Sequence, residues 1–118
     1  MTTETYPERY TDLSARMRQL GDAAPAIMKG FGTMHRSAST DGALTAATKE
    51  LMALAIAIVV RCDGCIAFHV HDAIQAGATE AEVNETIGVA VLMGGGPAAI
   101  YATEARRAYE EFTSTASG

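Results

Sequence analysis

The apolar run LMALAIAIVV at residues 51–60 limits the possible folds more than any other feature of this 118-residue chain. A helix that spans a bilayer needs about 20 such residues, so a run of this length indicates a helix inside a protein. The run is apolar on every side, and we therefore expect it to be buried all round. Because we find no strand-like alternation of useful length, the sequence predicts an all-α fold.

Helix start and stop signals recur along the chain. Pro7 and Pro25 each open a helix, Gly77 ends one, and Thr79 with Glu82 forms a T-x-x-E capping box. The predicted helices cover 7–20, a segment from Pro25 to a loop at 37–43, 46–60 after an N-cap at Thr45, 62 or 63 to 77, 80–93, and 97–112 after the GGGP break at 94–97.

We expect one compact domain in three parts. Residues 1–43 hold two helices and a loop, residues 44–112 form the core, and residues 113–118 form a frayed tail. The composition is 48% hydrophobic but only 6% aromatic, and alanine-rich helices bury little area each. We therefore expect other copies of the chain to cover part of its apolar surface. In the last helix, a stripe of small residues suits close helix contact: Ala98, Ala102, Ala105 and Tyr109.

Charge and termini narrow the possible partners. The net charge is −5, and no run of Lys or Arg is long enough to follow a phosphate backbone, so we expect no nucleic-acid partner. No segment is long enough for a membrane span, and MTTETYPERY lacks a signal-peptide pattern, so we expect a cytoplasmic protein without a membrane partner. In the cytoplasm, a C-x-x-C pair is typically catalytic or metal-binding.

The stretch RCDGCIAFHVH at 61–71 carries both cysteines and two of the three histidines of the chain. At about 100° per residue, Cys62, Cys65 and His69 share one face of a helix, and the cysteine Cα atoms lie roughly 5 Å apart. The cysteines also stand at the helix N-terminus, where unpaired N–H groups and the macrodipole stabilise a thiolate. Asp63 favours the dipole but repels a nearby thiolate. The stretch can therefore supply a reactive thiolate and a resolving thiol.

The other side chains of this helix have plainer interpretations. One neighbouring face is assigned to the core: Ile66, Val70, Ala73 and Ile74. His71 points away from Cys62, so we expect it to pack or to bond to another subunit, and we expect His35 to lie on the surface.

The residues alone leave three alternatives open for the cysteines. They can be small buried hydrophobes, a redox pair, or zinc ligands together with His69 and either Glu50 or water. Zinc is disfavoured because structural sites usually draw ligands from two segments, and the chain has no second cysteine pair. Glu50, twelve residues before Cys62, is either a solvated first-turn glutamate or a partly buried carboxylate that moves protons.

These motifs resemble a known family. Residues 44–105, LTAATKELMALAIAIVVRCDGCIAFHVHDAIQAGATEAEVNETIGVAVLMGGGPAAIYATEA, resemble the carboxymuconolactone decarboxylase superfamily in its AhpD-like alkylhydroperoxidase branch, as a single-repeat member. The resemblance covers about half of the chain and includes the Glu, the C-x-x-C pair, the His four residues on, the H-x-H pair and AGAT-x-x-E. It implies an all-α bundle that assembles as a trimer or as a hexamer built from dimers.

The resemblance also implies roles for four residues. Cys65 would be the peroxidatic thiol, Cys62 would donate a proton and then resolve the sulfenic acid, and Glu50 with His69 would form a proton relay. The substrate would be an organic hydroperoxide, and a dithiol donor such as a lipoylated or thioredoxin-like protein would reduce the disulfide. No metal or organic cofactor would be needed. The better-characterised peroxidase pattern has a His before the second Cys, where this chain has Gly64.

Two other functions remain as alternatives. A lactone decarboxylase belongs to the same superfamily, but that branch works without the cysteine pair. The third possibility is a helical oligomer without enzymatic activity, whose cysteines sense redox state or bind zinc.

Overall fold

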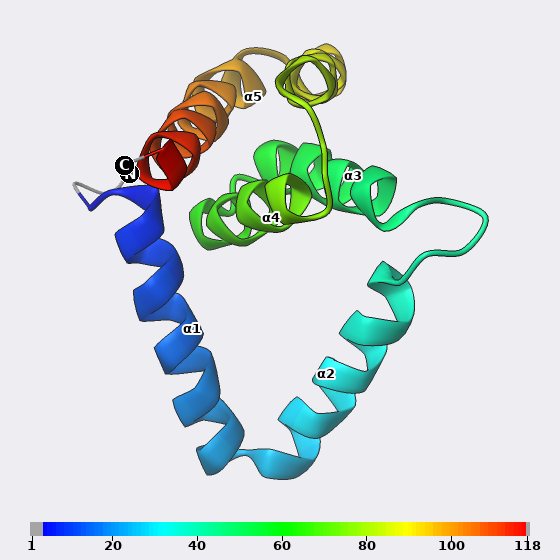
Figure 1. Ribbon diagram of the computed structural model, residues 1–118, viewed down its shortest axis with the longest axis vertical. Coiled ribbons are helices and arrows are strands. Elements are labelled where there is room, and N and C mark those ends of the chain that lie inside the picture. Colours follow the sequence, from blue (N-terminus) through cyan, green and yellow to red (C-terminus); the bar gives the residue numbers. More distant parts are fainter. Residues whose placement is uncertain (1–3, 118) are drawn as a thin grey trace.

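The computed structural model describes residues 4–117 and the side chains of residues 4–114. Within this range the chain is helical, without strands, and this confirms the all-α prediction (Figure 1). The helices are α1 (Tyr6–Ala23), α2 (Pro25–Ser39), α3 (Ala46–Val59), α4 (Asp63–Gln75) and α5 (Glu80–Ser117).

Helix α3 is the centre of the packing. It lies beside α4 and makes its most extensive contacts with α4 and α5 (Figure 1). Helices α1 and α2 form an open V on one side of this pair, with α1 against α4 and α5 and the end of α2 touching α3 (Figure 1). The start of α1 meets the C-terminal part of α5 (Figure 1).

The core follows the predicted faces. On α4, Ile66, Val70 and Ala73 are fully buried, and Ile74 packs against the same core while partly buried. The small-residue stripe on α5 is confirmed, because its three alanines are at most 6% exposed and Tyr109 packs beside them. Small side chains let α5 approach its neighbours closely.

Several helix boundaries differ from the predictions. Helix α1 begins one residue early, because Thr5 and Glu8 form a reciprocal capping box, and it runs on to Ala23. Helix α2 extends to Ser39, so the predicted loop at 37–43 is shorter. The final helix continues past 112 to Ser117, which overlaps the predicted tail at 113–118, and Gly118 lies outside the described residues.

The GGGP break lies inside α5. Gly95 has φ 69° and ψ −150°, a conformation that L side chains rarely adopt, and Pro97 follows two residues later. The predicted helices 80–93 and 97–112 therefore meet at a kink. By length and composition, the stretch Glu80–Ser114 is long and apolar enough to cross a membrane, although soluble core helices pass the same test and this stretch is broken at Gly95.

The turn between α3 and α4 sets the direction in which the cysteine helix begins. The N–H of Cys62 donates to the carbonyl of Ala57, and that of Arg61 donates to Ile58, the paired bonds of a Schellman motif. Arg61 is the left-handed residue of this motif, with φ 61°, where glycine is usual. The same motif ends α4 with Gly77 at φ 95°, as the sequence predicted.

The expectation that the run 51–60 is buried all round is wrong for the single chain. Leu54 and Ile58 are fully buried, whereas Met52 is 50%, Ile56 61% and Val60 62% exposed. Further exposed apolar side chains stand on the neighbouring helix α5: Val89, Leu92, Met93 and Ile100. An apolar side of α3 therefore continues onto α5 and faces outward.

Candidate active site

The cysteine pair stands at the first turn of α4. Cys62 is the N-cap of this helix, and its sulfur accepts the backbone N–H of Cys65 at 3.2 Å. The two sulfurs are joined as a disulfide, with Cα atoms 5.2 Å apart, close to the separation expected from helical spacing. Both cysteines are partly buried. The pair therefore has the geometry to alternate between a dithiol and an intramolecular disulfide.

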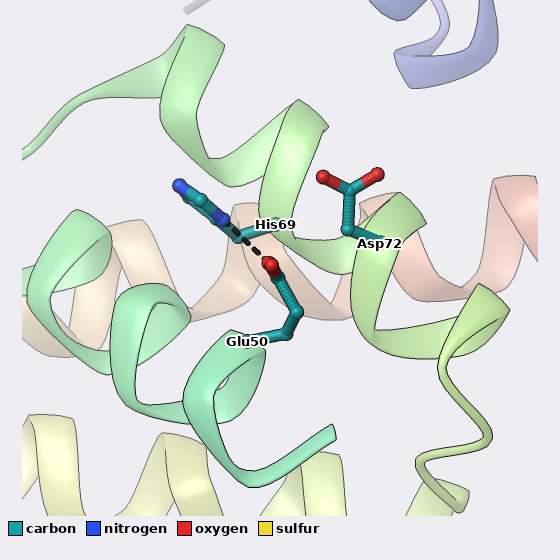
Figure 2. Close-up of side chains that lie close together, drawn as sticks. All are labelled: Glu50, His69 and Asp72. Carbon is teal, nitrogen blue, oxygen red and sulfur yellow. Dashed lines mark hydrogen bonds and ion pairs between the residues drawn. The ribbon is translucent and has the colours of Figure 1, made fainter. Parts of the chain in front are cut away.

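Glu50 and His69 meet across the interface between α3 and α4. Oε2 of Glu50 lies 2.8 Å from Nδ1 of His69, and the other ring nitrogen points away from the carboxylate (Figure 2). Glu50 is only 7% exposed and is the one buried charged residue in the described part of the chain. The interpretation of Glu50 as a solvated first-turn glutamate is therefore wrong.

This pairing determines what the imidazole can do. When Nδ1 carries the ring proton, it donates to Glu50 and leaves Nε2 as a proton acceptor. The carboxylate also stabilises the doubly protonated ring. A histidine held in this way can take a proton from a thiol and return it to a leaving group.

Asp63, which lies between the two cysteines, is held by a hydrogen-bond network that the sequence did not predict. The Tyr6 hydroxyl donates to Oδ1 of Asp63 at 2.5 Å, and Nε of Arg9 donates to Oδ2 at 3.1 Å. Tyr6 is fully buried, and the guanidinium of Arg107 on α5 lies 4.7 Å from the centre of its ring. Side chains of α1 and α5 therefore fix the first turn of α4.

This network changes the expected effect of Asp63 on the thiols. Burial, together with the hydrogen bond and charge of Asp63, raises the pKa of the Tyr6 phenol well above its usual value, so it remains a donor. Arg9 supplies a positive charge to the same carboxylate. The repulsion between Asp63 and a thiolate is therefore offset by its partners.

Gly64 lies under helix α1. A Cβ atom placed on Gly64 would be 2.9 Å from Cδ1 of Leu13, closer than such contacts normally come. A histidine at this position, as in the better-characterised peroxidase pattern, would require Leu13 to move. Helix α1 therefore packs so closely over the C-x-x-C motif that the position before Cys65 suits a glycine better than a histidine.

A pocket of about 620 Å³ lies between α1, α2 and α4, and both cysteines and His69 form part of its wall. Its size is in the range of small-molecule sites. Five of its other lining residues are large and apolar or aromatic: Tyr10, Leu13, Met17, Phe31 and Phe68. The remainder are Ser14, Gly32, His35, Arg36, Gly64 and Asp72. The sequence did not place the α1 and α2 members of this set at the site, because their positions depend on how these helices cross α4.

Glu50 and His69 border a second pocket, of about 480 Å³, on the side of α2 and α3. His69, Phe31 and His35 line both pockets, whereas Glu50 lines only the second of these two. The Glu50–His69 pair therefore connects the sulfur-containing pocket with a separate opening.

The remaining histidines occupy defined places. His71 stacks on Tyr10 with ring centres 3.9 Å apart, and its Nδ1 lies 2.9 Å from Oδ1 of Asp72. It therefore packs within the chain, which was one of the two expectations. His35 is exposed, as predicted, but it lines both pockets.

Two sets of side chains could hold a metal ion. One donor atom each of Glu50, His69 and Asp72 lies within 4.8 Å of the others. Nδ1 of His69 and Oε2 of Glu50 are already joined by a hydrogen bond of 2.8 Å, which a metal ion would have to replace. The zinc set considered from the sequence uses Cys62 and Cys65, which are bonded to each other here. Either set would have to rearrange to bind a metal.

Comparison with known proteins identifies the family. The carboxymuconolactone decarboxylase family model matches residues 25–108. The chain belongs to the carboxymuconolactone decarboxylase family. This confirms the family part of the resemblance described above.

Relatives and solved structures agree with this assignment. An uncharacterized protein of Cupriavidus necator is 40% identical over 105 residues, spanning 89% of this chain and 92% of its own length. A family member from Legionella pneumophila, solved in its apo form, is 41% identical with a TM-score of 0.88, covering 92% of this chain and 96% of its own. A Thermotoga maritima member, described as a candidate for a role in the antioxidative response, is 26% identical with a TM-score of 0.84, covering 92% and 93%.

The Asp63 network makes a prediction about thiol acidity. Arg9→Gln removes the positive charge beside the Asp63 carboxylate, so the pKa of the more acidic thiol in the reduced protein should rise, whereas Asp63→Asn should lower it. Thiolate ultraviolet absorbance followed against pH measures both values. Arg16→Gln is the control, because Arg16 pairs with Asp12 on the exposed side of α1. Equal shifts in the Arg9 and Arg16 variants would contradict a specific role for this network.

Proposed function

We propose that the protein is a thiol-dependent peroxidase that reduces organic hydroperoxides through the Cys62–Cys65 pair. The observation that carries this proposal is the placement of the pair and of His69 on one pocket wall, with His69 bonded to the buried Glu50. The pocket offers an apolar environment for an organic substrate. The lactone decarboxylase alternative receives less support, because it gives the two sulfurs no task.

The reaction follows the ordinary chemistry of thiols. The Cys65 thiolate attacks the terminal oxygen of the hydroperoxide, an S–O bond forms, the O–O bond breaks, and an alcohol leaves after it takes up a proton. Cys65 is thereby oxidised by two electrons to a sulfenic acid. The Cys62 thiol then attacks this sulfur, releases water and forms the disulfide. A dithiol donor, such as a lipoylated or thioredoxin-like protein, returns two electrons and two protons.

Glu50 and His69 move protons in this cycle. Nε2 of His69 accepts a proton as a thiol becomes a thiolate and returns it to the departing alkoxide. Glu50 keeps the ring oriented and stabilises its charged form. The second pocket gives the pair a route to exchange protons with solvent. The proposed location is the cytoplasm, where reducing systems regenerate dithiols.

Substitution of each cysteine tests the assigned roles. We expect the turnover rate of Cys65→Ser to be at least about 100-fold lower than that of the wild type, because no thiolate remains at position 65 to attack the peroxide. We expect Cys62→Ser to lose steady turnover but to retain one reaction, with a trapped sulfenic acid at Cys65. Consumption of cumene hydroperoxide with dihydrolipoamide as reductant measures turnover, and mass spectrometry measures the oxidation state. Full activity in Cys65→Ser would contradict the proposal.

The relay is tested by Glu50→Gln, which keeps the size of the side chain but removes its charge. We expect kcat/KM to fall about 10- to 100-fold, because His69 loses the carboxylate that orients its ring and balances its charge when it takes up a proton. The same hydroperoxide assay measures this loss. Glu85→Gln is the control, since Glu85 is exposed on α5. A rate in Glu50→Gln within about twofold of the wild type, or an equal loss in Glu85→Gln, would contradict a proton-transfer role.

We further propose that the protein is a homo-oligomer, a trimer or a hexamer built from dimers, as the family resemblance implies. Support comes from the outward-facing apolar side chains of α3 and α5, including Ile56 at 61% and Met93 at 75% exposed. Exposed apolar side chains grouped on adjoining helices are typical of protein–protein contacts.

Light scattering coupled to gel filtration tests the assembly. The wild-type protein should elute at a multiple of 12.3 kDa. Ile56→Lys places a charge in the proposed contact and should reduce the mass, whereas Gln19→Lys, at an exposed position of α1, should leave it unchanged. A wild-type monomer at micromolar concentration would refute the proposed oligomer.

A further inference from the structure

We propose that the sulfur-containing pocket selects hydroperoxides with an apolar chain and an anionic end, such as a carboxylate, and that Arg36 binds this end. The inference rests on the proposed peroxidase function, because it takes the sulfurs as the place where the hydroperoxide group reacts. It adds a substrate class and a specificity-determining residue.

The pocket walls differ in character. The α4 wall contains the cysteines and His69, and the α1 wall contributes Leu13 and Met17. Phe31 on α2 lies in the same pocket and is 44% exposed. An apolar chain between these walls would replace water at exposed carbon atoms, which favours binding in proportion to the area covered.

Arg36 places a positive charge at this apolar surface. It follows Gly32 by one helical turn on α2, and both residues line the pocket. A Cβ atom on Gly32 would be 3.3 Å from Nη1 of Arg36, so the guanidinium lies over the glycine, where a larger side chain would crowd it. Its Nη2 is 3.4 Å from the Thr33 hydroxyl, and the structure shows no ion pair for Arg36 among the described residues. The guanidinium is therefore available for a carboxylate.

The other ionisable groups of the pocket do not provide this function. Asp72 carries the opposite charge and bonds to His71, while His69 is paired with Glu50. His35 lies one residue before Arg36, but an imidazole, unlike a guanidinium, does not carry a permanent positive charge. Arg36 is the one arginine or lysine on the wall of this pocket. A neutral substrate would leave it unpaired.

A plainer interpretation is that Arg36 only stabilises the C-terminal end of α2, where a basic residue complements the helix dipole. The two interpretations predict different behaviour. A dipole role is indifferent to the charge of the substrate, whereas a binding role affects anionic substrates and spares neutral ones.

The experiment compares linoleic acid hydroperoxide with its methyl ester, both below the concentration at which they aggregate. We expect the wild type to prefer the acid by about 3- to 10-fold in kcat/KM, the range of a partly exposed ion pair. Arg36→Gln should remove this preference, with kcat/KM for the acid falling to about the value for the ester. Arg36→Lys should retain part of it, and Arg18→Gln, an exposed position outside the pocket, should retain all of it.

Equal use of acid and ester by the wild type, or an unchanged preference in Arg36→Gln, would overturn the inference. Failure to reduce either hydroperoxide would contradict the proposed function instead. In that case, calorimetry measures the binding of the corresponding hydroxy acid and of its methyl ester, and it tests the role of Arg36 without any turnover. Tighter binding of the acid that is lost in Arg36→Gln supports it, and binding that is equal for both compounds or unaffected by Arg36→Gln refutes it.

Discussion

A carboxylate inside a helical bundle is costly to bury unless it has a partner, and Glu50 obtains its partner from the neighbouring helix. Its hydrogen bond to His69 joins residues 19 apart in sequence and requires α3 and α4 to lie side by side (Figure 2). The apolar packing of Leu54 and Ile58 against Ile66 and Val70 provides that arrangement. The same packing that forms the core therefore orients the imidazole toward the pocket that contains the sulfurs.

A second set of contacts ties the cysteine turn to both ends of the chain. Tyr6 lies 57 residues from Asp63, and its backbone N–H donates to Glu111, 105 residues away. These bonds hold the first turn of α4 between α1 and α5. Arg61, in a left-handed conformation just before the pair, adds a local strain of the order of 1 kcal/mol that these contacts offset. The turn is thus held in place from outside its own helix.

Local spacing accounts for the parts that the sequence predicted. The shared face of Cys62, Cys65 and His69 follows from helical periodicity, and the capping box at Thr79 follows from side-chain hydrogen bonds three residues apart. The partners of Asp63 and the pocket could not be predicted, because they depend on how α1 and α2 cross distant helices. The apolar run at 51–60 misled for another reason: periodicity cannot distinguish a surface buried in the chain from an outward-facing one.

The arrangement also bears on how one fold can host different reactions. A histidine oriented by a carboxylate beside an apolar pocket can move protons for many substrates, including lactones, because nothing in that pair specifies sulfur chemistry. The specific element is the N-cap position of Cys62, which brings its sulfur to the backbone N–H of Cys65. This placement favours the anionic form of the Cys62 sulfur, the form that attacks an oxidised Cys65, and allows a disulfide to close without moving the backbone far. The proton-moving pair and the sulfur pair are therefore separable parts, and their meeting on one pocket wall gives this chain the means for thiol redox chemistry.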